Sequence, residues 1–274
     1  MGPSGPRFVF QGSSTGRSGL ELVDHMRIAL RVEYDGFRYA GWQIQKDATT
    51  IQSVLQKALS QVAAEPVSLV CAGRTDAGVH AMNQVVHFDT NAKRSMRSWV
   101  LGANSLLPPD VAVKQAQSMA QEFHARFSAI SRSYRYLITN QWVRSALTAK
   151  RAYWHCRRLD EQRMHQAAQY LLGEHDFTSF RAFSCQARHP VRTISRLDVT
   201  REGVLVTLDI EANAFLHHMV RNIAGVLIEI GRGDKDPGWV RTLLELKDRT
   251  RGGVTAPAHG LYLINVIYPE KFNL

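Results

Sequence analysis

The chain has 274 residues, of which 45% are hydrophobic, and a formal net charge of +10, so it is long and apolar enough for one large domain or two modest ones. Three widely spaced cysteines without a CxxC pair argue against a disulfide framework or a zinc site, and the lack of any run of about 18 apolar residues excludes a membrane-spanning helix, which together predict a reduced, cytoplasmic protein. Of the 34 basic residues eight are lysine and 26 are arginine, and because the arginine fork suits phosphate, the charge indicates a nucleic-acid partner, with an ordinary basic surface as the alternative.

The first predicted elements follow a segment of different composition. Residues 1–25 are rich in Gly and Ser and are predicted to be an expression leader. Residues 27–34 alternate apolar and polar side chains, which predicts a half-buried strand. After a polar loop, apolar residues recur at helical spacing over 51–62, with Thr49 and Gln52 as a capping box.

The rest of the first half is predicted to place a glycine-rich loop between two strands. These strands cover residues 67–71 and 84–88. A helix over 96–106 stops before a Pro-Pro pair, and a strand over 111–116 closes this half.

The second half is predicted to combine strands and helices in a similar way. Its predicted elements are a strand at 131–138, a helix at 161–172, a hairpin of 194–201 with 204–212, a helix at 216–230, a short helix from Pro237 and a strand at 261–268. Asp160 is the expected N-cap of the helix at 161–172, and Gly173 its stop. Because hairpins pair the strands while the helices are segregated, we predict an α+β fold with mostly antiparallel sheet, in two halves at 26–124 and 125–274.

The loop AGRTDAGVHA at 72–81 contains the strongest candidate for chemistry. Gly73 and Gly78 permit a tight turn that holds Asp76 at a sheet edge, beside Arg74. An ordinary Asp turn is one interpretation. The other is a carboxylate nucleophile or base, which the neighbouring arginine helps to keep ionised.

A second candidate is Arg221, which falls among apolar residues of the helix predicted at 216–230. A charge in such a place needs a partner. Arg221 is therefore either a surface residue at the edge of the apolar stripe or the partner of Asp76 across a cleft between the halves. His217 and His218 could be metal ligands, but neighbouring helical residues diverge by about 100°, which favours a core-edge or RNA-facing role.

A third candidate is the strand around Tyr134. Arg132, Tyr134, Arg135 and Tyr136 alternate basic and aromatic side chains. This pattern suits RNA, since arginines bind phosphates and each base–aromatic stack contributes roughly 1–3 kcal/mol; alternatively the tyrosines pack in the core. The sequence has no phosphate-binding, dinucleotide-binding, EF-hand or HExxH motif, which favours a reaction without a cofactor.

The segment at 72–80 resembles the signature of the TruA family of tRNA pseudouridine synthases. The resemblance covers the chain from Met26 onward, and residues 1–25 have no counterpart in it. Further motifs in family order lie at 34–36, 41–43, 123–129, 134–136, 173–180, 218–223 and 258–262.

The resemblance implies a homodimeric isomerase that converts uridine to pseudouridine in the anticodon arm of tRNA, at tRNA positions 38–40, without metal or small-molecule cofactor. It implies that Asp76 is the catalytic aspartate, Arg221 its basic partner and Tyr134 the ring that stacks on the target base. Arg74 would assist base extrusion, and Leu261 would form an apolar wall of the pocket. The implied pseudouridine synthase fold has two similar halves whose sheets merge around a central basic cleft.

Two other functions are weighed against this enzyme. A non-catalytic RNA-binding or chaperone module would not need Asp76, Tyr134 and Arg221 together. A carboxylate glycosidase would need a second carboxylate near Asp76, for which Glu33, Asp35 and Asp89 are the candidates. For the synthase, the resemblance and the chemistry leave open whether Asp76 attacks ribose C1′ or uracil C6, and which base removes the C5 proton.

Overall fold

The computed structural model describes residues 25–274, so the predicted leader lies outside the described residues except for His25. The strands are β1 (Met26–Tyr34), β2 (Val70–Cys71), β3 (His80–Thr90), β4 (Val111–Met119), β5 (Ser131–Asn140), β6 (Tyr153–His155), β7 (Gly173–Asp176), β8 (Val191–Glu202), β9 (Leu205–Ala212) and β10 (Leu261–Ile267). The α-helices are α1 (Ile51–Ala63), α2 (Met96–Leu106), α3 (Glu161–Gln169), α4 (Met219–Gly231) and α5 (Trp239–Leu246).

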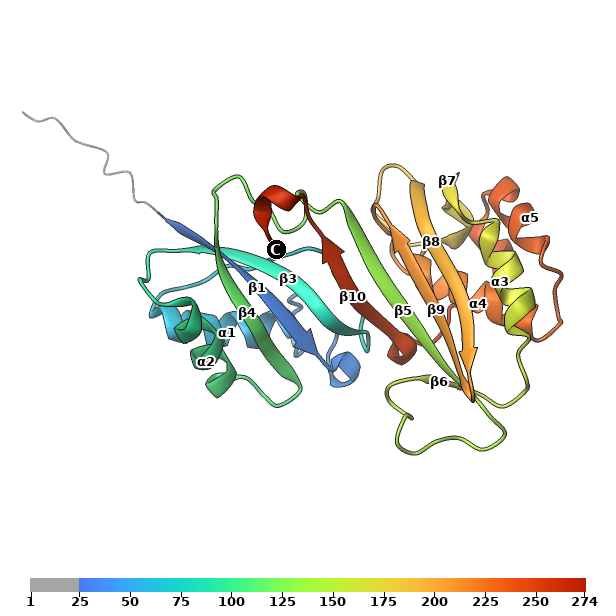
Figure 1. Cartoon of the computed structure of the whole chain (residues 1–274), viewed down its shortest axis with the longest axis horizontal. Coiled ribbons are helices and arrows are strands. Elements are labelled where there is room, and N and C mark those ends of the chain that lie inside the picture. The colour runs from blue at the N-terminus through green and yellow to red at the C-terminus, as the bar shows by residue number, and fades with distance from the viewer. Residues whose placement is uncertain (1–24) are drawn as a thin grey trace, which may run out of the picture.

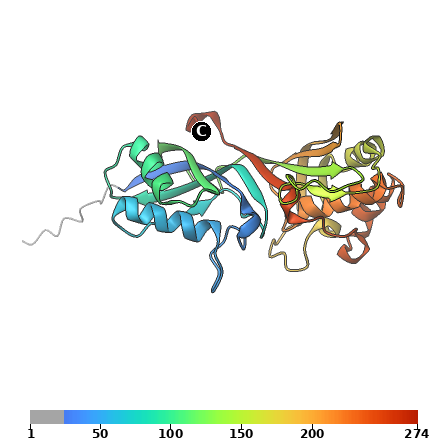
Figure 2. The same ribbon diagram turned by 90° about the horizontal axis from the view of Figure 1, so that it is seen from below.

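One ten-stranded sheet runs through the described chain. Its strand order is β4-β1-β3-β10-β5-β9-β8-β7, with β2 added to β3 and β6 added to β5. Helices α1 and α2 lie at one end of the molecule and α3, α4 and α5 at the other (Figure 1), and Figure 2 shows the same two groups well apart. The pairing is antiparallel except between β3 and β10 and between β5 and β6. The predicted α+β class with mostly antiparallel sheet is therefore confirmed.

The strand that joins the two ends of the sheet is β10, the last strand along the sequence. It pairs in parallel with β3 through Tyr262 and Leu263, and antiparallel with β5 along the register from Leu261 to Ile267. In Figure 1 it is the red arrow between β3 and β5. Because the sheet passes through β10 without a break, the division into 26–124 and 125–274 stays a prediction.

Helix α1 shows where the predicted capping was wrong. The N-cap is Thr50, whose hydroxyl accepts from the Ser53 amide at 3.2 Å, while the Ser53 hydroxyl accepts from the Thr50 amide at 3.1 Å. The capping box is thus shifted by one residue from Thr49 and Gln52. Gln52 is buried instead, and its side-chain amide donates to the Leu69 carbonyl at 3.2 Å, so its polar group is used to fix the helix against the strand region.

Two predicted helices differ at their ends, while α2 (Met96–Leu106) matches the prediction. Helix α3 keeps Asp160 as its N-cap, but it ends at Gln169, and Gly173 (φ +89°) opens β7 instead of stopping the helix. Helix α4 begins at Met219 because the preceding residue, His218, is left-handed, with φ of +62°. Among residues 25–274, no helix combines the length and apolar character that crossing a membrane requires.

Candidate active site

The loop between β2 and β3 is held by buried partners on both sides. The Trp42 amide donates to the Thr75 carbonyl at 2.9 Å, and the Tyr34 hydroxyl lies 2.8 Å from the Thr75 hydroxyl. Gly41 has φ of +92°, and a Cβ there would lie 2.8 Å from the Thr75 carbonyl oxygen and 3.0 Å from the Ala77 amide nitrogen. A glycine is needed at this position because the neighbouring backbone comes so close. The loop that carries Asp76 is therefore held in place by the end of β1 and by the segment that follows it.

The structure brings Asp76 and Arg221 together. The Arg221 Nη1 donates to Asp76 Oδ2 at 3.0 Å, and the side chains are 15% and 21% exposed for Arg221 and Asp76 respectively. The Arg221 Nε also donates to the Ala256 carbonyl at 2.9 Å, which fixes the guanidinium plane. The guanidinium of Arg221 on α4 thus faces the carboxylate of Asp76 on the opposite side of the cleft. Asp76 is the partner that a charge on an apolar helix needs.

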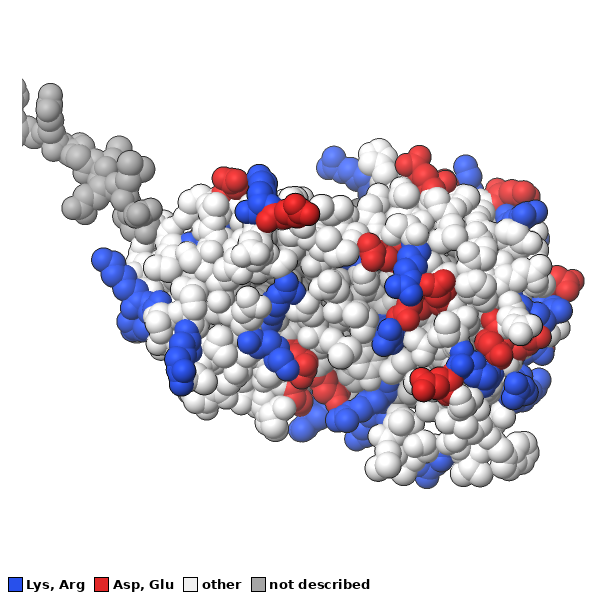
Figure 3. All heavy atoms as spheres, viewed as in Figure 1, with Lys and Arg blue, Asp and Glu red and all other residues white. Residues whose placement is uncertain are grey.

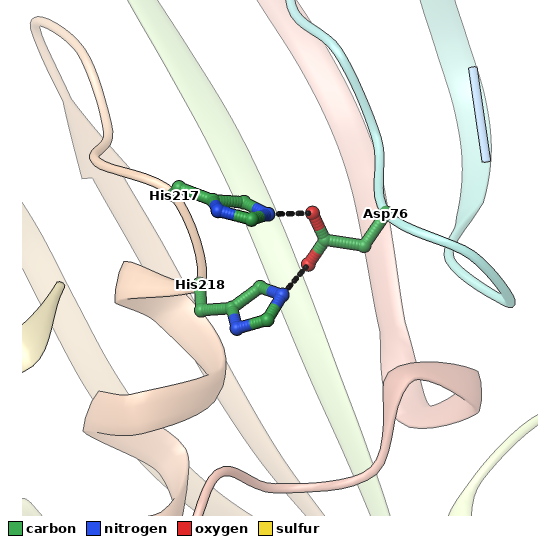
Figure 4. Close-up of side chains that lie close together, drawn as sticks. All are labelled: Asp76, His217 and His218. Atoms are coloured by element: carbon green, nitrogen blue, oxygen red, sulfur yellow. Dashed lines mark ion pairs between the residues drawn. The ribbon is translucent and has the colours of Figure 1, made fainter. Parts of the chain in front are cut away.

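Two histidines also face Asp76, which the sequence analysis did not foresee. His217 Nε2 lies 3.3 Å from Oδ1 and His218 Nε2 lies 3.4 Å from Oδ2 of Asp76 (Figure 4). Both residues precede α4, so the divergence expected of neighbouring helical residues does not apply, and the left-handed backbone of His218 allows both rings to point the same way. Burial lowers the pKa of His218, against the opposing effect of the Asp76 carboxylate, so this ring favours its neutral form.

Of the two tyrosines on β5, only one reaches the cleft. Tyr134 lines the cleft, packs edge-on against Phe215 with ring centroids 5.1 Å apart, and is 8% exposed. Tyr136 is buried, and its hydroxyl donates to the Pro257 carbonyl at 2.8 Å. The alternative that the tyrosines pack in the core is therefore the one that describes Tyr136. Leu261 lies beside β5 at the start of β10 and lines the same cleft.

The arginines of β5, for which the sequence pattern predicted phosphate binding, are bonded within the protein, and their role towards phosphate stays a prediction. Arg132 is 9% exposed and donates to the carbonyls of Ala129, Asn213, Ala72 and Arg126 at 2.6–3.3 Å. Arg135 donates to both carboxylate oxygens of Asp209, at 2.7 and 3.0 Å. The Arg132 guanidinium is therefore held by backbone carbonyls, and that of Arg135 is held by Asp209.

The cleft around Asp76 is basic and has a volume of about 1100 Å³. Among the described residues, its lining contains one carboxylate, Asp76, and five arginines: Arg74, Arg126, Arg132, Arg192 and Arg221. By contrast, Figure 3 shows basic and acidic side chains interspersed over the face of the molecule drawn there. A cleft with five guanidiniums and one carboxylate is suited to a polyanion.

The carboxylates that a glycosidase would need lie elsewhere. Glu33 and Asp35 line a different pocket, and Asp89 is bonded to Arg27 at 2.7 Å. None of the three lines the Asp76 cleft. The glycosidase alternative therefore lacks its second catalytic group.

Comparisons with known proteins agree on one family. A family model described as tRNA pseudouridine synthase matches residues 30–128 and 167–269. A tRNA pseudouridine synthase A of Vibrio vulnificus is 56% identical over 249 residues, covering 91% of this chain and 94% of the relative. Proteins of the same name from Legionella pneumophila and Coxiella burnetii are 57% and 54% identical, and cover 91% and 90% of this chain.

Proposed function

The chain belongs to the tRNA pseudouridine synthase family and is thus an isomerase that acts on tRNA, and we propose that it modifies uridines of the anticodon arm with Asp76 as its nucleophile. The observation that supports this role is the position of Asp76. It is the one carboxylate among the described residues that line the arginine-rich cleft, and it is bonded to Arg221 at 3.0 Å. A carboxylate held in this way is ready to attack carbon.

Uridine must leave the base stack before a group in this cleft can reach it. Flipping a nucleotide costs a few kcal/mol, and contacts between basic residues and the RNA backbone offset that cost. The exposed Arg74 lies next to Asp76 on the rim of the cleft. Its guanidinium would contact the backbone beside the flipped nucleotide and assist extrusion.

The flipped base would lie between Tyr134 and Leu261. Both side chains line the cleft and are almost fully buried, at 8% and 5% exposed. A tyrosine ring in this position stacks on the face of a base, and this contact does not depend on the nucleotide sequence. Leu261 supplies an apolar surface on the other side, so the uracil is held while its bond to the sugar is broken.

The proposed chemistry is a rearrangement with no net gain or loss of atoms. In one route an oxygen of Asp76 bonds to ribose C1′ as the C1′–N1 bond breaks, and the uracil leaves as an anion. The base rotates, C5 bonds to C1′ and the carboxylate is expelled, after which C5 loses its proton and N1 gains one. In the other route Asp76 adds first to C6 as the C5–C6 π bond breaks to an enolate. The C1′–N1 bond then breaks, C5 bonds to C1′, and loss of the C5 proton expels the carboxylate from C6 while N1 gains a proton. Both routes use Asp76 as a carboxylate, whose Oδ2 accepts a charge-assisted hydrogen bond from Arg221.

The test is the Asp76→Asn variant. It should lose pseudouridine formation on unmodified tRNA while its affinity for tRNA stays within about threefold, since the amide keeps the shape of the carboxylate. Asp198→Asn, at a surface ion pair with Arg196, is the matched control and should keep its activity. Turnover by pure Asp76→Asn would remove Asp76 from the nucleophile role. Mapping of the product positions would show whether the anticodon arm is the target.

Three further proposals concern the oligomeric state, the location and the cofactor requirement of the protein. We expect a homodimer in the cytoplasm that needs no cofactor. Light scattering of the purified protein measures the oligomer, and a monomer at micromolar concentration would contradict this expectation. Activity that survives dialysis against a chelator would support the cofactor-free reaction.

A further inference from the structure

Three side chains with metal-binding atoms, Asp76, His217 and His218, converge near the N-terminal end of α4. His217 Nε2 lies 3.3 Å from Asp76 Oδ1, and His218 Nε2 lies 3.4 Å from Oδ2. The donor atoms of all three residues lie within 4.8 Å of one another (Figure 4). Zn²⁺ and the neighbouring divalent transition metals bind to sets of two imidazoles and one carboxylate.

The two distances are long for hydrogen bonds but suit a shared ion. A charge-assisted N–H to carboxylate bond has a donor–acceptor distance of about 2.7–2.9 Å. In a tetrahedral zinc site with bonds of about 2.0–2.1 Å, neighbouring ligand atoms lie about 3.3 Å apart. The spacing of His217 Nε2 from Asp76 Oδ1 therefore matches one edge of such a tetrahedron, and His218 Nε2 lies within 4.8 Å of the other two donor atoms.

Two contacts around the three residues bear on such a site, one in its favour and one against it. His217 Nδ1 lies 3.3 Å from the Ser184 hydroxyl, an outer partner of the kind that orients a ligating imidazole. Arg221 is bonded to Asp76 Oδ2, and its charge opposes a cation. A carboxylate has about four lone-pair positions on its two oxygens, so Oδ1 can bind a metal while Oδ2 keeps Arg221.

We infer that Asp76, His217 and His218 form a binding site for Zn²⁺, and that the bound ion inhibits the enzyme. All three residues line the cleft of about 1100 Å³, so the ion enters and leaves from solvent. The inhibition rests on the proposed role of Asp76, since a metal-bound carboxylate is not free to attack. Mg²⁺ prefers an all-oxygen octahedral shell and does not bind here at comparable concentration.

Binding is tested without any activity measurement. The full chain, free of RNA and with Cys156→Ser and Cys185→Ser to remove accessible thiols, is titrated with Zn²⁺ against a chromophoric chelator. We expect one equivalent to bind, and His217→Ala and His218→Ala to weaken binding at least about tenfold. His189→Ala, an exposed histidine, is the matched control and should bind as the parent does.

Two results would overturn the site. One is a parent protein that binds no stoichiometric Zn²⁺, and the other is equal affinity in His217→Ala, His218→Ala and the control. Circular dichroism checks the fold of each variant, and Co²⁺ supplies a measurement on the parent alone. Tetrahedral Co²⁺ absorbs strongly in the visible range, so a weak octahedral spectrum would also contradict the proposed geometry.

Inhibition is tested separately on tRNA turnover. Zn²⁺ should stop pseudouridine formation, EDTA should restore it, and Mg²⁺ at the same concentration should have no effect. Stoichiometric Zn²⁺ binding with undiminished turnover would keep the metal site and refute Asp76 as nucleophile. Turnover that depends on Asp76 in a protein that binds no Zn²⁺ would refute the metal site and leave the proposed function standing.

Discussion

Replacing Arg221 by methionine isolates the contribution of the ion pair to the chemical step. Methionine keeps an unbranched stem on α4 but removes the donor at 3.0 Å from Asp76 and the donor at 2.9 Å from the Ala256 carbonyl. Both partners in the ion pair are largely buried, at 15% and 21% exposed. A hydrogen bond to a charged group contributes about 1.5–3 kcal/mol, and each 1.4 kcal/mol is about tenfold in rate, so the rate of the chemical step should fall roughly 10- to 150-fold.

The assay is single-turnover pseudouridine formation with enzyme in saturating excess over tRNA, so that weaker binding does not enter the rate. Arg135→Met is the matched control. It breaks a partly exposed ion pair with Asp209, away from the lining of the cleft, and should change the rate less than twofold. A rate for Arg221→Met within twofold of the parent, or an equal loss in Arg135→Met, would refute the reasoning.

Three other perturbations follow from the described contacts. Arg74→Ala should lower the slope of log K for tRNA against log salt by about 0.7–0.9, as expected for one lost phosphate contact, and an unchanged slope would place Arg74 away from the RNA. Gly41→Ala should lower turnover by up to about 100-fold for each ångström that Asp76 moves, because the new Cβ meets the Thr75 carbonyl at 2.8 Å; full activity would show that the loop yields freely. Burial lowers the pKa of His87 to about 4, so the unfolded chain binds the extra proton and the free energy of unfolding should fall by at most about 3 kcal/mol as the pH drops from about 6.5 to about 4. Urea unfolding measures this fall in the free energy of unfolding. The fall should be smaller in His87→Gln, and an equal fall in that variant would show that His87 is not its source.

The sequence predicted those parts of the site that depend on local pattern. A charge among the apolar residues of a helix required a partner, and Arg221 has it in Asp76. Glycines at fixed places required a turn, and Asp76 lies in one, between β2 and β3. These inferences succeed because the cost of burying a charge and the steric limits of the backbone act on each residue wherever the rest of the chain lies.

What the sequence did not predict depends on partners far along the chain. The left-handed backbone at His218 decides that both rings face Asp76, and no residue type other than glycine signals such a conformation reliably. The strand pattern around Arg132 fitted RNA, but its guanidinium donates to four backbone carbonyls, of which those of Ala72 and Asn213 lie far along the chain. The pairing of β10 between β3 and β5 also joins residues far apart in sequence, which periodicity cannot reveal.

The central place of β10 has a consequence for how the protein is made. During synthesis β3 and β5 leave the ribosome long before Leu261, and until then each has a bare edge where β10 will bind. Such edges invite pairing with other chains, and contacts of high sequence separation form slowly. A chain released from the ribosome before β10 is made would therefore hold an incomplete sheet prone to aggregate, and the cleft around Asp76 would form only after translation is nearly finished.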